Sequence, residues 1–354
     1  MQTECFTVEA ALAERFERTG RQFGARTAHA AELAAWQSEA RSRLRRLIGL
    51  DTMQECALDP IIGPLEELDG YTRRRISIAV EPGVRMPIYL LAPADLRPGE
   101  RRPVLIAPHG HGGGGKATVA GLRDTPARAA AIDTYRYDYG VAFARAGFVT
   151  FCPDARGFGE RREYTTLATG DELGSSCREI NNMAMPLGQT VTGMWVWDLM
   201  RLIDYIATRD DCDATRIGCG GLSGGGLQTL WLAALDLRVR CAVVSGYFYG
   251  YKESLLHMNQ NCSCNYVPGL WQLLDMGDLG ALIAPRPLLI ESGSRDPLNG
   301  ASGLANVAAQ LAIAAGAYAT HHAAEALEHT VFEGEHRWDG AATIPWLQRN
   351  LLHV

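Results

Sequence analysis

Hydrophobic positions near the start of the chain recur with the period of a helix. Between residues 7 and about 50, apolar side chains are spaced by three and four positions with charged residues between them: Leu33, Trp36, Ala40, Leu44 and Leu47. This spacing predicts an amphipathic helical region. Asp59-Pro60 and Gly63-Pro64 then break the pattern, because proline and glycine interrupt regular structure. We therefore expect a helical N-terminal extension over residues 1–62, packed on the domain that follows.

The rest of the chain changes to short apolar runs separated by helical stretches. Residues 74–80 and 86–91 flank a Glu-Pro-Gly-Val turn, which predicts an antiparallel hairpin. Runs typical of buried strands follow at residues 103–108, 148–152, 215–219, 241–245, 288–291 and 331–333. Stretches of helical composition lie among them at residues 139–146, 190–206, 227–235 and 344–352. This alternation predicts an α/β fold, with a mostly parallel sheet and helices on both faces, in one domain over residues 63–354.

One predicted strand-to-helix junction is unusually rich in glycine. Its sequence, Gly218 to Gly226, contains Gly221, Ser223 and Gly225 at the fixed positions of a G-x-S-x-G motif. Such a turn is a nucleophile elbow. The serine there has a strained backbone that costs about 1–3 kcal/mol, and its neighbours must lack clashing side chains. Ser223 is therefore the candidate nucleophile, and a glycine-rich turn that merely contains a serine is the alternative.

A serine hydroxyl needs a base to take its proton and an acid to orient that base. The run 288–291 leads into a loop that carries Asp296, and the run 331–333 leads into a loop that carries His336. The chain order serine, acid, histidine is the order of α/β-hydrolase sheets. We predict that Asp296 and His336 fill these roles. Glu291 is the competing acid, but its mid-strand position should turn it into the sheet. Three other late histidines fall in or beside predicted helix: His321, His322 and His329.

The oxyanion formed in acyl transfer needs backbone N–H donors already in place. We predict the amides of Gly224, directly after the nucleophile, and of His111, in the glycine-rich loop after the run 103–108. The same loop nearly matches the phosphate-binding pattern G-x-x-x-x-G-K-[ST]. Ala117 replaces the hydroxyl residue of that pattern, so a nucleotide-hydrolysing protein is the weaker alternative. Asp154 and Arg156 are expected to brace neighbouring loops.

Composition excludes several classes of partner. The chain has 354 residues, a net charge of −6 and a pI of about 5.9, which gives no indication of a nucleic-acid or anionic-membrane partner. Residues 1–6 carry an acid where a signal peptide has basic residues, and no apolar run is long enough to cross a bilayer. We therefore expect a cytoplasmic protein without a membrane partner.

The cysteines do not suggest a disulfide framework, because there are nine of them scattered over a long chain. Cys262 and Cys264, with His257 nearby, offer two thiols in a C-x-C spacing, and no second pair follows. We therefore expect no metal ligands, and neither a metal nor an organic cofactor.

With these residues in view, the chain resembles the α/β-hydrolase superfamily. The elbow at Ser223, Asp296, His336 and the loop around His111 carry this resemblance. Further stretches resemble dienelactone-hydrolase-like and acetyl-xylan-esterase-like bacterial serine esterases: residues 153–161, 265–270, 276–279, 284–293 and 333–338. Dienelactone hydrolases proper have a cysteine nucleophile, whereas this chain has Ser223. The resemblance therefore implies an esterase and leaves dienelactone itself open.

We expect the chain to hydrolyse a carboxylic ester of a small molecule through an acyl-enzyme. A C–C bond or thioester hydrolase with the same three residues is the alternative, and a non-catalytic binding scaffold is the alternative from another class. Residues 247–278 follow a strand end and are rich in aromatic side chains, so we expect Tyr249 and Trp271 to line the substrate pocket. The alternatives for this segment are a contact between subunits of a homo-oligomer and a surface excursion packed on its own aromatic side chains.

Overall fold

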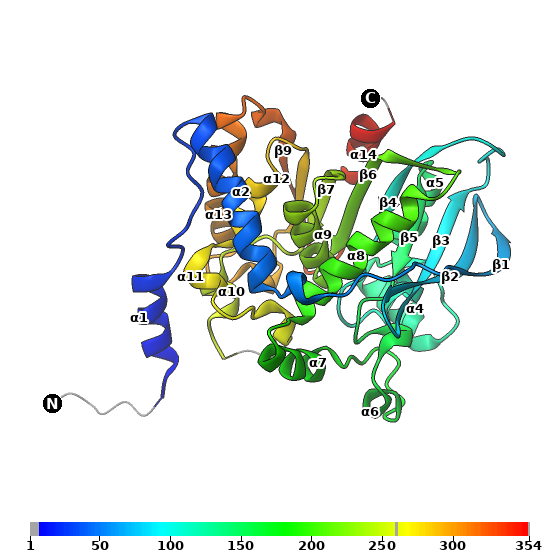
Figure 1. The fold of residues 1–354 in the computed structure, drawn as a ribbon, viewed down its shortest axis with the longest axis horizontal. Coiled ribbons are helices and arrows are strands. Elements are labelled where there is room, and N and C mark those ends of the chain that lie inside the picture. The colour runs from blue at the N-terminus through cyan, green and yellow to red at the C-terminus, as the bar shows by residue number, and fades with distance from the viewer. Residues whose placement is uncertain (1–6, 259–260, 353–354) are drawn as a thin grey trace.

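The computed structural model describes residues 7–258 and 261–352, so the first six residues considered above lie outside it. Its described residues form a nine-stranded sheet in the order β1-β2-β3-β5-β4-β6-β7-β8-β9 (Figure 1). The strands are β1 (Ile61–Leu68), β2 (Tyr71–Glu81), β3 (Val84–Pro93), β4 (Arg102–Ile106), β5 (Val149–Pro153), β6 (Cys212–Leu222), β7 (Val239–Ser245), β8 (Leu288–Gly293) and β9 (Leu327–Phe332).

The sheet combines an antiparallel edge with a parallel centre. β1, β2 and β3 pair antiparallel, and β3 also pairs antiparallel with β5. All pairings from β5 through β4, β6, β7 and β8 to β9 are parallel. The predicted hairpin and the predicted mostly parallel sheet are therefore confirmed. Because parallel strands place their carboxyl ends at one edge, the loops after β4, β6, β8 and β9 meet there.

Helices cover both faces of this sheet, as predicted. The longer ones are α1 (Glu9–Thr19), α2 (Ala30–Leu47), α4 (Pro126–Tyr135), α5 (Tyr139–Arg145), α7 (Cys177–Ala184), α8 (Val191–Ala207), α9 (Gly224–Leu235), α12 (Met276–Ile283), α13 (Leu304–Thr320) and α14 (Thr343–Leu351). The shorter helical turns are η1 (Leu50–Thr52), α3 (Lys116–Val119), η2 (Gly159–Arg161), α6 (Tyr164–Leu167), η3 (Met185–Leu187), α10 (Tyr251–Leu255), η4 (Ser263–Asn265), α11 (Leu270–Leu273), η5 (Pro297–Asn299) and η6 (Ala324–Ala326).

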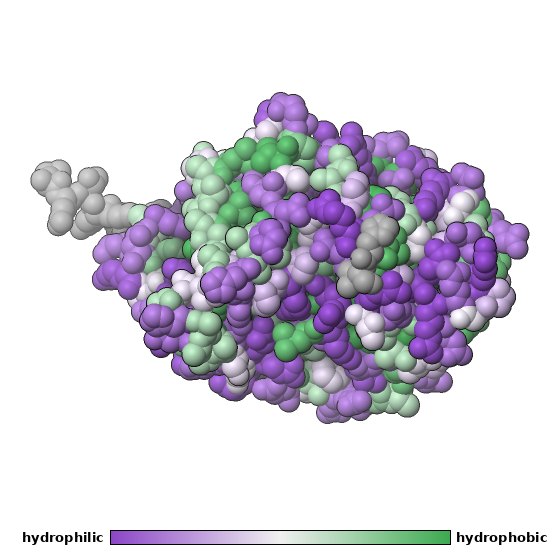
Figure 2. Space-filling model, turned by 90° about the horizontal axis from the view of Figure 1, so that it is seen from above, coloured by the Kyte–Doolittle hydropathy of each residue, from purple (hydrophilic) through white to green (hydrophobic). Residues whose placement is uncertain are grey.

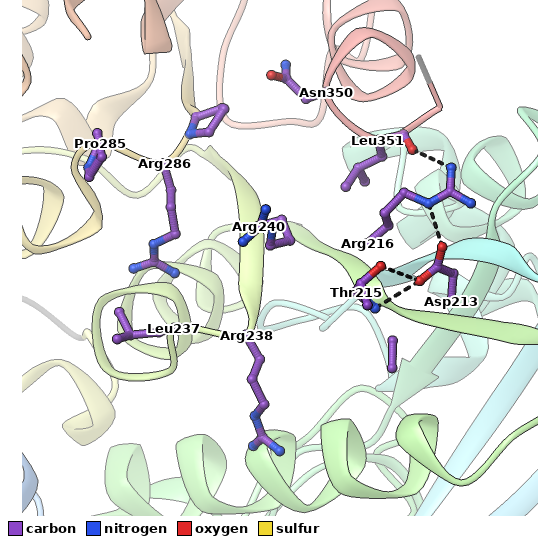
Figure 3. Close-up of a pocket in the computed structure, with 12 residues that line it drawn as sticks. Asp213, Thr215, Arg216, Leu237, Arg238, Arg240, Pro285, Arg286, Asn350 and Leu351 are labelled. Carbon is purple, nitrogen blue, oxygen red and sulfur yellow. Dashed lines mark hydrogen bonds and ion pairs between the residues drawn. The ribbon is translucent and has the colours of Figure 1, made fainter. Parts of the chain in front are cut away.

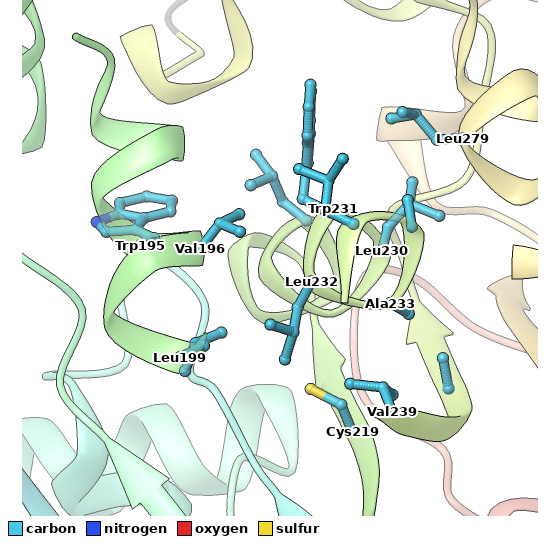
Figure 4. Packing of buried hydrophobic residues seen from close by; sticks show 14 of the residues in the cluster. Trp195, Val196, Leu199, Cys219, Leu230, Trp231, Leu232, Ala233, Val239 and Leu279 are labelled. Atoms are coloured by element: carbon cyan, nitrogen blue, oxygen red, sulfur yellow. The ribbon is translucent and has the colours of Figure 1, made fainter. Parts of the chain in front are cut away.

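Two apolar clusters form the core, one on each face of the sheet. The larger joins the strands to α2, α8, α9, α12 and α13, and the smaller joins them to α5 and α14. Figure 4 shows part of the larger cluster, where Trp195 and Leu199 of α8 face Leu232 of α9 above Cys219 of β6. The helix that follows Ser223 is buried along its whole length. The turn at Ser223 is thus held between a central strand and a central helix.

The N-terminal region differs from the prediction of a helical region running unbroken to about residue 50. α1 ends at Thr19, and α2 begins only at Ala30. The segment between them begins with a turn at residues 20–23, and the amides of Arg21, Gln22 and Phe23 donate to carbonyls of residues 271–273. Backbone pairing with a distant segment therefore overrides the local helical pattern here.

Two strands were also misjudged from the sequence. β1, which was not predicted, begins at Ile61, and many of its side chains are exposed, so it lacks the apolar run that marks a buried strand. β9 begins at Leu327 and contains His329, which was assigned to a predicted helix or its flank. β9 begins earlier than predicted because Leu327 already pairs with Leu288 of β8.

A large surface depression lies away from the elbow. A depression of about 940 Å³ is lined by residues at the start of β6 and β7, such as Asp213, and by arginines (Figure 3). Arg216 there binds Asp213 and the carbonyl of Leu351. Because β6 ends at Leu222, directly before Ser223, this depression and the elbow lie at opposite ends of the same strand.

The outer surface is mixed in character. On the face shown in Figure 2, hydrophilic residues predominate and hydrophobic ones form smaller areas, the largest toward the upper left. Among the residues that the structure describes, no helix is long and apolar enough to cross a membrane.

Candidate active site

Ser223 lies on a sharp turn between β6 and α9. Its φ is 59° and its ψ −119°, a conformation that non-glycine residues rarely adopt, and its N–H donates to the carbonyl of Ser245 at 2.9 Å. A Cβ on Gly221 or Gly225 would lie 2.6 or 2.2 Å from the Pro108 carbonyl oxygen. These contacts leave no room for side chains beside the serine, which is the steric reason for the glycines in the motif.

Asp296 and His336 meet at the carboxyl edge of the sheet. Asp296 follows β8, and its Oδ2 lies 2.6 Å from Nδ1 of His336, which follows β9. The aspartate side chain is 1% exposed and the histidine 18% exposed. Oδ1 of Asp296 accepts the N–H of Leu298 at 2.9 Å, which fixes the carboxylate in place. The structure therefore brings together the acid and base that the sequence predicted.

The His336 ring also lies close to the strand that supports the serine turn. A Cβ built on Gly246 would be 2.9 Å from its Cε1. Gly246 follows Ser245, whose carbonyl holds the N–H of Ser223. The histidine ring thus reaches the same corner of the sheet as the serine.

Glu291, the competing acid, points elsewhere. Its carboxylate accepts hydrogen bonds from Ser245 Oγ and from the amides of Asp339 and Gly340, at 2.8 to 3.2 Å, and also from Thr343 Oγ1. Burial raises the pKa of this carboxyl, and these donors partly offset the effect. Glu291 therefore joins β7 and β8 to the start of α14 and the residues before it, and these hydrogen bonds do not include His336.

A small cavity of about 210 Å³ opens beside Ser223. The described residues that line it come from five stretches of the chain: His111, Ser223, Gly224, Tyr247, Tyr249, Asn261, Cys262, Asn265 and Leu298. The predicted oxyanion donors His111 and Gly224 are both among them. A Cβ on Gly224 would lie 2.8 Å from Nδ1 of His111, so the two residues are in close proximity.

The two predicted pocket residues are separated by the structure. Tyr249 lines the Ser223 cavity, whereas Trp271 is not among the described residues around it. The Trp271 ring packs against Phe16, Tyr251 and Tyr266 and borders two other surface depressions. Contacts with α1 and α10 draw this side chain away from the serine, which corrects the expectation for Trp271.

Some lining residues were not selected from the sequence. Tyr247 and Asn265 lie in the aromatic segment 247–278, and Tyr247 Oη donates to Asn265 Oδ1 at 2.8 Å. The aromatic density of the segment identified Tyr247 as a candidate pocket residue as strongly as Tyr249. Leu298 belongs to the loop after Asp296, and no sequence pattern identified it as a pocket residue.

In the loop that resembles a phosphate-binding pattern, the lysine forms ion pairs within the chain. Lys116 Nζ lies 2.7 Å from Asp154 and 2.5 Å from Glu160, and its side chain is almost fully buried. Burial acts to raise the pKa of Glu160, but Arg75 and Lys116 outweigh it and hold that pKa at about 2. Lys116 thus binds carboxylates of its own chain, which weakens the nucleotide-binding alternative.

Asp154 and Arg156 brace separate contacts. Asp154 pairs with Lys116, whereas Arg156 lies 2.7 Å from both Glu81 and the buried Asp198. Both residues therefore fix the loop after β5 to its neighbours, as expected, although they do not pair with each other.

Four potential metal ligands converge beside the cavity. His111, Cys177, Cys262 and Cys264 place one ligand atom each within 4.8 Å of one another. The pKa of Cys262 is lowered by its hydrogen bonds with Cys177 and Cys264, while burial raises the pKa of Cys264. The sequence offered only the two thiols of the C-x-C pair, and its third candidate, His257, does not belong to this group. Neither Cys177 nor His111 was recognised as a possible metal ligand, because both lie far from the C-x-C pair in the chain.

Comparisons with known proteins agree with this architecture. "Putative hydrolase YtaP" of Bacillus subtilis (strain 168) is 32% identical over 144 residues, which cover 40% of this chain and 48% of that relative. The match thus spans about half the length of the curated relative.

Solved structures resemble the whole chain. One described as a "putative acetyl xylan esterase" from Bacteroides fragilis NCTC 9343 gives a TM-score of 0.79 at 16% identity, covering 98% of this chain and 95% of its own. A glucuronoyl esterase from Solibacter usitatus gives 0.64 at 17% identity, covering 98% and 97%. At these identities the likeness shows a shared fold.

The model of the Abhydrolase family matches residues 16–350, nearly the whole chain. The α/β-hydrolase fold and the resemblance predicted from the elbow and its neighbouring motifs are confirmed, and the chain belongs to the Abhydrolase family.

Proposed function

We propose that the chain is a serine hydrolase that cleaves a carboxylic ester of a small molecule. Ser223 Oγ attacks the ester carbonyl while His336 takes its proton, and His336 then gives a proton to the departing alcohol. Asp296 orients His336 and stabilises its cationic form. Water, activated by the same histidine, releases the acid from the acyl-enzyme. The observation that carries the proposal is the 2.6 Å contact between Asp296 and His336 at the edge where the strained Ser223 turn lies.

The loop before the cavity supports the oxyanion assignment. The carbonyls of Pro108, His109 and His111 each accept a hydrogen bond, from Tyr139, Gln228 and Tyr137 respectively. A loop held at three of the four carbonyls between Pro108 and His111 keeps its amides in fixed positions. We assign the amides of His111 and Gly224 as the donors to the oxyanion, because a preorganised donor needs no rearrangement during the reaction.

The size of the cavity favours a small acyl or alcohol group. About 210 Å³ is below the volume of a typical drug-sized site. Two of the structurally similar proteins are described as esterases of acetyl xylan and of glucuronoyl groups, which supports an ester as the substrate class.

The eight described cysteines form no disulfide with one another, which fits a reducing compartment such as the cytoplasm.

The experiment that tests the proposal uses the nucleophile itself. Wild-type protein should hydrolyse short p-nitrophenyl esters and should be labelled by a fluorophosphonate probe. Ser223→Ala should lose activity by a factor of about 10⁶ and should not be labelled. Its Tm should stay close to the wild-type value, because no core volume changes. Substantial esterase activity in the folded variant would refute the mechanism.

A thioester or C–C bond substrate is the second candidate, since the same three residues can serve either reaction. Parallel rates on matched oxygen esters, thioesters and vinylogous diketones distinguish these possibilities. We expect the oxygen esters to give the highest kcat/KM. An unlabelled, inactive wild-type chain would instead favour a binding scaffold.

A further inference from the structure

Three thiols and one imidazole from separate parts of the chain meet beside the Ser223 cavity. Cys177 begins α7, Cys262 and Cys264 flank Ser263 at η4, and His111 lies in the loop after β4. Their ligand atoms lie within 4.8 Å of one another, and Cys264 Sγ is 3.6 Å from His111 Nε2. Eighty-five positions separate Cys177 from Cys262, so the tertiary fold creates this cluster.

The geometry points to a site for one Zn²⁺ ion, held by the three cysteine sulfurs and by Nε2 of His111. A tetrahedral zinc site has Zn–S distances of about 2.3 Å and Zn–N distances of about 2.0–2.1 Å, which places neighbouring ligand atoms about 3.6–3.8 Å apart. The Cys264–His111 separation already has this value. Thiolates with an imidazole in tetrahedral arrangement favour zinc over harder cations, which prefer oxygen ligands.

The surroundings of the cluster hold its ligands in place. Thr192 Oγ1 donates to the Cys264 carbonyl at 2.7 Å, and Asn181 Nδ2 donates to the Ser263 carbonyl at 3.2 Å. Asn265 Nδ2 lies 3.0 Å from the Cys262 carbonyl and 3.8 Å from Cys264 Sγ. Such outer contacts are typical of metal sites, because they orient ligands and stabilise thiolate charge.

Aromatic rings enclose the imidazole. The His111 ring centroid lies 4.9 Å from that of Phe158 and 6.3 Å from that of Trp195. Its Nδ1 faces Gly224, while its Nε2 faces the thiols. Metal coordination at Nε2 places the ring proton on Nδ1, toward the Ser223 cavity. The ion would thus fix both the tautomer of His111 and the loop that carries its amide.

Four protein ligands leave no open position, so the site is structural and takes no part in bond cleavage. Binding releases up to three thiol protons to solvent, one for each cysteine that was protonated. This inference goes beyond the proposed esterase function and does not depend on it, since zinc content can be measured in an inactive protein. It also replaces the expectation from the sequence that the chain carries no metal.

The direct test measures metal in the intact purified protein. Elemental analysis of wild-type protein, purified without chelator, should find about one zinc per chain. Replacement by Co²⁺ should give the visible bands of a tetrahedral ion and a thiolate charge-transfer band. Protein that contains no zinc and also fails to bind added Zn²⁺ or Co²⁺ would overturn the proposal. A disulfide among Cys177, Cys262 and Cys264, detected by mass spectrometry of the native protein, would overturn it as well.

Variants separate this site from any other thiol. Cys177→Ser and Cys264→Ser should each weaken zinc binding by at least about 10-fold, measured by competition with a chromogenic chelator. Cys56→Ser and Cys212→Ser are the matched controls, because these residues lie outside the cluster, and both should keep wild-type zinc content. If the cluster variants do not fold, wild-type protein can be titrated with an organomercurial to test the same ligands. We expect one zinc to be released as Cys177, Cys262 and Cys264 become modified. Equal zinc loss in the Cys56 or Cys212 variant would refute the assignment.

Discussion

At the scale of single residues, two carboxylates near the end of β8 have different surroundings and so different proposed roles. Asp296 is fixed by the Leu298 amide and contacts His336 directly. Glu291 is buried among four donors from β7, from the residues before α14 and from the first residue of α14, and burial raises its pKa. The contrast indicates an orienting role for Asp296 and a structural role for Glu291.

Exchanging each acid for its amide should separate these roles. Asp296→Asn should lower kcat by a factor on the order of 10⁴, because the amide favours the wrong imidazole tautomer. Glu291→Gln should instead lower the free energy of unfolding by about 1–3 kcal/mol, because an amide cannot accept from all the donors that surround it. Ester hydrolysis and urea unfolding measure the two effects. A larger loss of kcat in Glu291→Gln than in Asp296→Asn would contradict the assignment of the acid.

Tyr249 and Trp271 form a second pair that the structure distinguishes. Tyr249 lines the Ser223 cavity and Trp271 does not, although both belong to the same aromatic segment. Tyr249→Ala should enlarge the cavity and raise kcat/KM for longer acyl esters relative to acetate. Trp271→Ala is the control and should leave that ratio unchanged. Unchanged ratios in both variants, together with a lower apparent mass, would indicate that the segment joins subunits.

At the scale of elements, ion pairs join the loops on either side of the site. Lys116, at the start of α3, binds Asp154 after β5 and Glu160 in η2. Glu160 also pairs with Arg75 of β2 at 2.5 Å. These contacts tie the glycine-rich loop that carries His111 to the antiparallel edge of the sheet, which limits its movement.

The Glu160 carboxylate should make stability depend on acid pH. Its pKa is about 2 in the folded chain and near 4.5 when unfolded, so the unfolded state takes up the proton first as the pH falls. The stabilisation is present above about pH 4.5 and disappears toward pH 2. The difference in free energy of unfolding between wild-type protein and Glu160→Gln should therefore be largest near neutral pH and shrink toward pH 2. A difference that stays constant over this range would contradict the depressed pKa.

At the scale of the whole molecule, the N-terminal region is fastened to the rest of the chain. Arg21 donates to both oxygens of Asp278 at 2.8 and 2.9 Å, and that carboxylate is fully buried. Asp278 also accepts the amide of Ala25 and that of Asp275, the N-cap residue of α12. We propose that the N-terminal region up to residue 62, which the structure describes from residue 7, forms an extension of the catalytic domain and does not fold apart from it.

Removing the Arg21 side chain tests this attachment. Arg21→Ala should lower the free energy of unfolding by about 1–3 kcal/mol, because a buried acceptor loses its charged donor. Arg18→Ala is the matched control, since the Arg18–Glu14 pair is exposed and such pairs contribute little. Urea unfolding of both variants measures the effect. Equal, small losses would show that the extension is only loosely attached.

The sequence by itself determined the features that depend on local patterns. Apolar runs revealed most strands and several of the longer helices, although not α4, α7, α12 or α13. The steric demands of the Ser223 turn left its glycines as a visible motif. Because parallel strands end at one edge, the positions of Asp296 and His336 after their strands were enough to predict their meeting.

Contacts between distant segments were decided only by the tertiary structure. The break between α1 and α2 follows from backbone pairing with residues 271–273, and the position of the Trp271 side chain follows from packing on α1 and α10. The cluster of Cys177, Cys262, Cys264 and His111 exists only once α7, η4 and the loop after β4 are packed together. Local spacing carries no information about such contacts, because their free energy arises from burial and pairing across the fold.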